Sequence, residues 1–230
     1  MLKLITYPAA FDLFAASPFC VKAAYLLNMS GLPWEREDTL DPRKAPYGKL
    51  PVLRTPDGLV PDSDGIRTYL EAQGACFDTG LSDVDKANAR AFIRLAEEHF
   101  YFHLVYDRWA NDDVWPTIRD VYFQQIPVFL RGFVAGSIRK NTLAGLHHHG
   151  VARYSEQDRL ARLETDLEAV TTRLWHGKFL FGDTPTGADA SLAPMLAAAL
   201  ATPVETPVKR LIAGNGVLTA YVERSETLMG

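Results

Sequence analysis

A serine and a cysteine, Ser17 and Cys20, stand three residues apart in the segment Ser17-Pro18-Phe19-Cys20. Serine followed by proline is typical of a helix start, with Ser17 at the N-cap and Pro18 at the first helical position. A hydroxyl there can donate a hydrogen bond to an incoming thiolate, and the helix dipole stabilises the same negative charge. The dipole would also lower the pKa of an exposed Cys20 thiol, but most cysteines inside helices are small buried hydrophobic residues. We therefore expect thiolate chemistry at Ser17 and a structural role for Cys20.

A second polar segment, Pro61-Asp62-Ser63-Asp64-Gly65, precedes a helix predicted from Asp64 to about Gln73. Ser63 is its predicted N-cap, and its hydroxyl and the first N–H groups of the helix form an anion site that suits a carboxylate. Asp62 or Asp64 could take an ammonium group, so the segment suits the α-amino acid end of a ligand. A plain capped helix with acidic residues in its first turn is the alternative.

Pro51 stands near the start of a short predicted strand, Leu50 to Arg54. Proline has no N–H to donate, and a cis bond before it would let Leu50 offer both its N–H and its C=O to an extended peptide, as in strand addition. An ordinary strand-start proline is the alternative.

These three segments belong to a pattern of strand, helix, strand, then two strands and a helix, over residues 1–75. Residues 2–8 predict a buried strand that Pro8 ends, and a helix from Cys20 to about Met29 ends at Gly31. Trp34 to Leu40 alternates as a second strand, which favours a parallel pair joined by a right-handed crossover. Residues 56–58 predict the tight turn of a hairpin with Leu59 and Val60 in its returning arm.

After a small and polar linker at 74–82, the spacing of apolar residues is helical through residues 83–230. Helices are predicted at 83–110, 114–146, 155–175 and 188–201, followed by two shorter ones, with Pro116 starting the second and Pro127 kinking it. The stretch 188–201 is nearly all small and apolar, so it should lie buried at the centre of the bundle. Thr186 and Asp189 before it form a capping box, which is a folding element.

Composition excludes several classes of protein. The 230 residues carry 24 Lys and Arg against 28 Asp and Glu, and no basic cluster suited to nucleic acid appears. Two cysteines are too few for a secreted disulfide framework, and no apolar run is long enough for a transmembrane helix. The start is too short and too soon interrupted for a signal peptide, so we expect a cytoplasmic location. His147, His148 and His149 point about 100° apart on a helix, so we expect no metal site.

Taken together, four segments resemble the glutathione transferase superfamily. They are S-P-F-C at 17–20, K-L-P-V-L at 49–53, D-S at 62–63 and F-G-D-x-P-T-x-A-D at 181–189. Ser-Pro-Phe-Cys-Val-Lys at 17–22 and Gly150-Val-Ala-Arg153-Tyr154-Ser155 are similar to the branch of metaxins and failed-axon-connections proteins, with tyrosine in place of that branch's histidine.

The resemblance implies an α/β thioredoxin-like N-terminal domain (βαβ-ββα) over 1–75, an all-α C-terminal bundle over 83–230, and a homodimer. It implies that glutathione is a co-substrate, with no metal. Pro51 would be cis, Leu50 would pair with the cysteinyl backbone of glutathione, and Asp62 and Ser63 would hold its γ-glutamyl end. Ser17 would face the sulfur. The implied glutathione site consists of Lys49, Leu50, Pro51, Asp62 and Ser63, and the electrophile pocket is expected near Phe14, His103, Tyr106 and Asp107.

Two departures from the family pattern matter. Ser17 replaces the catalytic cysteine of oxidoreductase-like members, which argues against a dithiol reductase that uses Cys20. The loop between Pro8 and Ser17 is longer than usual. The first functional hypothesis is therefore an enzyme that adds the glutathione thiolate to a small hydrophobic electrophile. The second is a non-catalytic, metaxin-like binding or protein-interaction module.

Overall fold

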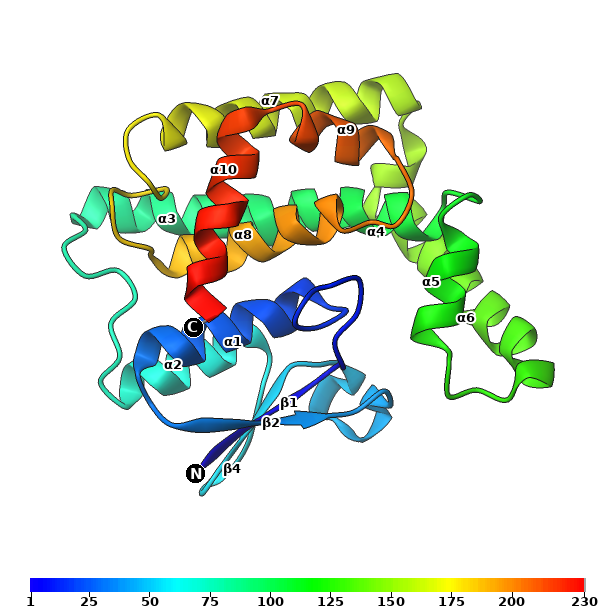
Figure 1. Cartoon of the computed structure of the whole chain (residues 1–230), viewed down its shortest axis with the longest axis horizontal. Coiled ribbons are helices and arrows are strands. Elements are labelled where there is room, and N and C mark those ends of the chain that lie inside the picture. Colours follow the sequence, from blue (N-terminus) through cyan, green and yellow to red (C-terminus); the bar gives the residue numbers. More distant parts are fainter. Residues whose placement is uncertain (230) are drawn as a thin grey trace.

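A computed structural model describes residues 1–229 of the chain. A four-stranded sheet and two helices form the first domain, and a bundle of helices packs on the helical side of it (Figure 1). The protein is therefore a thioredoxin-like domain followed by an all-helical domain, as the sequence predicts.

The sheet contains β1 (Leu2–Thr6), β2 (Trp34–Asp38), β3 (Val52–Thr55) and β4 (Gly58–Pro61), in the order β2-β1-β3-β4. β1 and β2 are parallel, while β3 runs antiparallel to both β1 and β4. Leu2, Leu4 and Thr6 alternate inward along β1. This alternation buries one face of the strand against helices, as period-two patterning requires.

Helix α1 (Pro18–Ser30) lies between the sheet and the helical domain (Figure 1). Nine of its residues are buried, because it contacts both layers. Ser17 is its N-cap, Pro18 opens it, and Gly31 ends it with a left-handed φ of 69°, all as predicted. Helix α2 (Ser63–Ala72) follows β4 and completes the first domain.

The helical domain begins with α3 (Asp83–Arg94), which continues through a π-helical turn, η3 (Leu95–Phe100), into α4 (Tyr101–Trp109). Next come α5 (Trp115–Tyr122) and α6 (Val128–His149), which extend away from the other helices (Figure 1). They are followed by α7 (Glu156–Leu174), α8 (Gly187–Leu200), α9 (Pro207–Ala213) and α10 (Gly216–Ser225). No helix within residues 1–229 has both the length and the hydropathy for crossing a bilayer.

Helix α8 is the centre of the bundle, as its small apolar residues predict. Twelve of its residues are buried, and the capping box of Thr186 and Asp189 is formed. Small side chains let neighbouring helices approach closely, so α8 packs against α1 on one side and against α3, α9 and α10 on others.

Two predictions about helix boundaries were wrong. The N-cap of α2 is Asp62, whose side chain accepts from the Asp64 N–H, and Ser63 is the first helical residue. The stretch 114–146 forms two helices, because Pro127 begins α6 after a break instead of kinking one long helix. Proline suits the start of a helix, where its missing N–H costs nothing.

A buried lysine joins the two domains through ion pairs. The Lys22 ammonium on α1 lies 2.7 Å from Asp64 on α2 and 2.6 Å from Glu97 on η3, and the lysine is 1% exposed. A charge this deeply buried needs such partners, so the three elements hold a fixed mutual position.

Candidate functional site

The strand registers bring the three segments identified in the sequence to one end of the sheet. Ile5, near the end of β1, pairs with Val52 at the start of β3, and Val52 also pairs with Pro61 at the end of β4. The exit of β1, the Leu50–Pro51 segment and the start of α2 therefore lie side by side. The Asp62 N–H donates to the Pro51 carbonyl at 3.2 Å, which closes this edge.

Ser17 lies at the start of α1, beside the exit of β1. It is half-buried, and its side chain makes no capping hydrogen bond within the described chain. Its backbone is extended, at φ −102° and ψ 125°. Pro18 has no N–H, and the N–H groups of Cys20 and Val21 donate to the Ser17 carbonyl. The Ser17 hydroxyl and the Phe19 N–H are therefore the groups that this helix start can offer to a negatively charged ligand.

Cys20 lies one turn into α1 and is completely buried. Burial raises the pKa of its thiol, although hydrogen bonds with Thr6, the Tyr7 backbone and Ser17 act in the opposite direction. A buried thiol with a raised pKa is a poor nucleophile, which supports a structural role.

The peptide bond between Leu50 and Pro51 is cis, as the resemblance implies. The N–H and C=O of Leu50 take no part in the β-ladders or in other hydrogen bonds among residues 1–229. Lys49 beside it is exposed. Leu50 thus presents an unpaired backbone donor and acceptor at the edge of the site.

The start of α2 differs from the expected ammonium and carboxylate site in one respect. The Asp64 carboxylate is already bound by Lys22 at 2.7 Å and Arg94 at 2.6 Å. Burial raises its pKa, but these cations outweigh that effect and lower it to about 2. Asp62 is exposed, whereas Ser63 is only 2% exposed. Asp62 is therefore the carboxylate of this segment that a ligand can reach.

The long loop between Pro8 and Ser17 is held by two arginines that sequence reasoning missed. Arg36 on β2 lies 4.1 Å from the Phe14 ring centroid and donates to the Tyr7 carbonyl at 3.3 Å. Arg108 on α4 donates to the Ala16 carbonyl at 3.5 Å. The sequence signal for Arg108 was its place one turn after the core residue Leu104, which puts a charge on the buried face of a helix.

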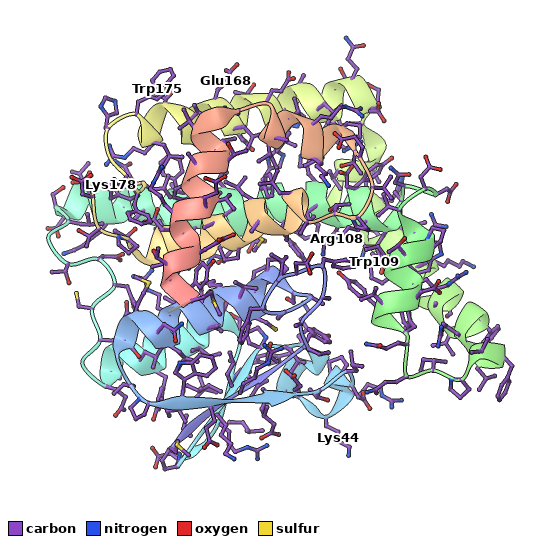
Figure 2. The ribbon with its side chains drawn as sticks, in the orientation of Figure 1. Lys44, Arg108, Trp109, Glu168, Trp175 and Lys178 are labelled. Atoms are coloured by element: carbon purple, nitrogen blue, oxygen red, sulfur yellow. The ribbon has the colours of Figure 1, made fainter. Side chains whose placement is uncertain are left out.

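An aromatic cluster lies beside this loop. The Phe11 ring is 6.2 Å from Tyr122 of α5, and Tyr122 is 6.1 Å from Trp109 of α4. Figure 2 shows Arg108 and Trp109 where α4 approaches α5 and the loop before α1. The cluster offers an apolar surface next to the start of α1.

Of the four residues expected to form the electrophile pocket, Phe14 lies apart, and the other three face Arg159 of α7 together. Phe14 contacts Trp34 and Arg36 at the β2 side. His103 and Asp107 are 1% and 4% exposed and face α7 and α9 instead of Ser17. Tyr106 stacks under Arg159 of α7, at 4.0 Å. The rotation of α4, which the sequence does not fix, accounts for this placement.

The buried face of α4 toward α7 is strongly desolvated. Burial, with a smaller contribution from His99, lowers the pKa of His103 to about 3, so this imidazole is neutral at physiological pH. Burial also raises the pKa of Asp107. His99 on the adjoining turn pairs with Asp166 of α7. These groups tie α4 to α7 within the helical domain.

Over the described part of the chain, no group of three or more His, Cys, Asp or Glu residues is arranged to hold a metal ion. The histidines at the end of α6 have other contacts. His149 stacks on Phe102 with ring centroids 3.7 Å apart.

Comparisons with known proteins show the family of the chain. The family described as "Glutathione S-transferase N-terminal domain" matches residues 18–115, and "Glutathione S-transferase, C-terminal domain" matches 151–224. The isoprene-epoxide–glutathione S-transferase of Rhodococcus sp. (strain AD45) is 32% identical over 200 residues, covering 84% of each chain. The chain belongs to the glutathione S-transferase family.

Other relatives in this family carry different names. Metaxin-1 of Mus musculus is 29% identical over 74% of this chain, which spans 56% of the length of that relative. Among solved structures, glutathione transferase GSTFuA3 from Phanerochaete chrysosporium superposes with a TM-score of 0.67 at 20% identity, covering 99% of this chain and 96% of that one. The beta-etherase LigF from Sphingobium sp. strain SYK-6 superposes with a TM-score of 0.65 at 18% identity, covering 99% and 96%. At these identities the structures show the fold alone.

Proposed function

We propose that this transferase-family protein binds glutathione at the end of its sheet and adds the glutathione thiolate to a small hydrophobic electrophile. One observation carries the proposal: the free backbone groups of Leu50, the start of α2 and the hydroxyl-bearing start of α1 meet at one edge. A relative that covers most of the chain is named as a transferase for an epoxide.

In this proposal the tripeptide lies along the edge as an added strand. Its cysteinyl backbone pairs with the N–H and C=O of Leu50. The γ-glutamyl carboxylate meets Ser63 and the free N–H groups of α2, and the ammonium group meets the exposed Asp62. Lys49 is available to the glycyl carboxylate, because it is exposed next to Leu50.

The thiol of bound glutathione then reaches the start of α1. Ser17 donates a hydrogen bond to the sulfur, and the helix dipole adds to the stabilisation, so the thiol loses its proton to solvent near neutral pH. The sulfur lone pair forms a bond to carbon. With an aryl halide the halide leaves with its bonding electrons, and with an epoxide the carbon–oxygen bond breaks and the oxygen takes a proton from solvent.

The aromatic cluster of Phe11, Trp109 and Tyr122 supplies the electrophile side in this proposal. It lies between the loop before Ser17 and α5, and its rings present apolar surface suited to a small hydrophobic molecule. We propose this cluster in place of Phe14, which lies at the β2 side, and of His103, Tyr106 and Asp107, which face α7.

A non-catalytic binding module is the second candidate, because several metaxin-1 proteins match 74% of the chain. The two candidates differ in what Ser17 does. A transferase needs the hydroxyl for chemistry, whereas a binding module does not.

Isothermal titration with glutathione, followed by conjugation of chlorodinitrobenzene and a small epoxide, separates these candidates. Binding together with conjugation supports the transferase. Binding without conjugation supports the module, and the absence of binding rejects both glutathione readings.

A serine series then tests the role of the hydroxyl. Ser17→Ala should lower kcat about a hundredfold and change glutathione affinity less than threefold, because an oxyanion-type donor acts mainly on the charged state. Ser17→Thr keeps a hydroxyl and should retain more activity. Ser137→Ala, on an exposed position of α6, is the matched control. Equal losses of affinity and kcat in Ser17→Ala would show that the Ser17 hydroxyl does not stabilise the thiolate.

A further inference from the structure

Arg108 of α4 is a buried cation at the junction of the two domains. It is 3% exposed, and its guanidinium reaches three different elements. One terminal nitrogen donates to the Tyr122 hydroxyl of α5 at 2.9 Å and to the Ala16 carbonyl at 3.5 Å, and the other donates to the Ala198 carbonyl of α8 at 2.6 Å. The same guanidinium lies 5.3 Å from the Phe11 ring centroid.

These contacts fix the residue just before Ser17. Ala16 is the end of the long loop, and its carbonyl receives both Arg108 and the Tyr122 hydroxyl, at 3.5 Å each. The loop contains Phe11 and Asp12 at positive φ of 56° and 60°, a backbone conformation that surrounding contacts must maintain. Arg108 therefore holds the start of α1 from the helical domain.

All partners of Arg108 are neutral. Its hydrogen bonds go to two carbonyls and one phenol, and it forms no ion pair within residues 1–229. Its Nε is buried without a partner. A buried cation normally has a carboxylate beside it, because desolvation of an uncompensated charge is costly. Arg108 thus leaves a net positive charge next to the start of α1.

The titratable groups around it do not cancel this charge. Burial raises the pKa values of Tyr7 and Tyr101 to about 12, so both phenols stay neutral, and burial also raises the pKa of the Cys20 thiol. Asp107, next in sequence, interacts electrostatically with Arg108, but burial raises the pKa of this carboxyl group and its hydrogen bond is with Thr206 on the side of Arg159. Arg36 on β2 adds a second cation that is paired with Asp38.

We propose that Arg108 is a positioning residue of the thiolate site: it fixes Ala16, and with it Ser17, and its uncompensated charge stabilises the glutathione thiolate. This inference rests on the proposed transferase function. The anion that is missing from the surroundings of Arg108 would then be supplied by the bound thiolate itself, since an opposite charge nearby favours the ionised form of an acid.

The direct measurement is the ultraviolet absorbance of the thiolate as the complex of the full chain with glutathione is titrated with alkali. In the natural chain the bound thiol should ionise below about 8.5, the value of a free cysteine. Arg108→Gln should raise this pKa by about one unit, whereas Arg108→Lys, which keeps the charge, should restore most of the shift. Conjugation by Arg108→Gln should fall about tenfold near pH 6.5 and recover at high pH.

A second pair of variants leaves the arginine in place, in case Arg108→Gln does not fold. Tyr122→Glu sets a carboxylate against the guanidinium and should raise the pKa of the bound thiol by about one unit, while Tyr122→Gln should leave that pKa unchanged. Equal pKa values in all four variants and the natural chain would overturn the inference. If the natural chain binds glutathione without lowering the pKa of its thiol, the result contradicts the proposed function itself, whatever the role of Arg108.

Discussion

The starts of α8 and α1 expose the same kind of backbone N–H groups, but the polar groups around them differ in whether they have partners within the protein. At the start of α8, the Asp189 carboxylate is fully buried and accepts four hydrogen bonds, from the Leu180 N–H, the Thr186 N–H and hydroxyl, and the Tyr221 hydroxyl. At the start of α1, the Ser17 side chain makes no capping bond within the described chain. A helix start whose polar groups are satisfied internally stabilises the fold, and one whose groups are left free can bind a ligand.

The start of α2 lies between these extremes. Asp64 in its first turn forms ion pairs with Lys22 of α1 and Arg94 of α3, whereas Asp62 is exposed. The same helix therefore carries a structural carboxylate and a reachable one, two residues apart.

The largest effect is expected where the satisfied helix start is broken. Asp189→Asn replaces one acceptor by a donor and leaves buried N–H and O–H groups without partners, so the free energy of unfolding should fall by about 3 kcal/mol. Urea denaturation measures the loss. Asp183→Asn, at an exposed position in the same segment, is the control. A loss below about 1 kcal/mol would show that the capping network contributes little.

The intermediate helix start predicts a dependence of stability on pH. The cations beside Asp64 lower its pKa to about 2 in the folded chain, below the ordinary value of 3.8. Its contribution of about 2 kcal/mol is therefore present above pH 4 and is lost as the pH falls toward 2. Urea midpoints between pH 5 and 2.5 measure this loss, and Asp64→Asn should remove that part of the slope. An unchanged slope would contradict the assignment.

A smaller effect is expected from the N-cap serines of α7 and α1, of which only the first makes a capping hydrogen bond. Ser155, the N-cap of α7, accepts a hydrogen bond from the Asp158 N–H at 3.1 Å, and Ser17 makes no such bond. Ser155→Ala should therefore lower the free energy of unfolding by about 1 kcal/mol, and Ser17→Ala by less than about 0.5 kcal/mol. Thermal unfolding of both variants tests the difference. Similar losses would mean that Ser17 also stabilises its helix.

The smallest effect concerns the two thiols. Cys20 is completely buried with a raised pKa, while Cys76 is exposed. A thiol reagent should therefore modify Cys76 in the native chain and reach Cys20 after unfolding. Cys20→Ala should change conjugation by less than about twofold, because a small apolar side chain replaces a buried thiol. Loss of activity in Cys20→Ala would instead support the hypothesis of a reductase that uses Cys20.

The local elements could be predicted because their signals lie within a few residues. Ser17-Pro18 began α1, Gly31 ended it, and the capping box at Thr186 preceded the buried α8. The cap of α2 was misassigned by one residue, since Asp62 and Ser63 are both good caps. Only the structure shows that Asp62 has the non-helical backbone and accepts from the Asp64 N–H. Pro127 was misread because a proline inside a helical pattern either kinks a helix or starts a new one.

By itself, the sequence determined the strands, the helices and the polar segments that meet at the end of the sheet, because side-chain periodicity and capping act over short distances. The tertiary structure alone decided which face of α4 meets the loop before Ser17. It turned His103 and Asp107 toward α7 and Arg108 toward Ala16. A helix rotates to bury the face that its neighbours in space can cover, and those neighbours are distant in the chain.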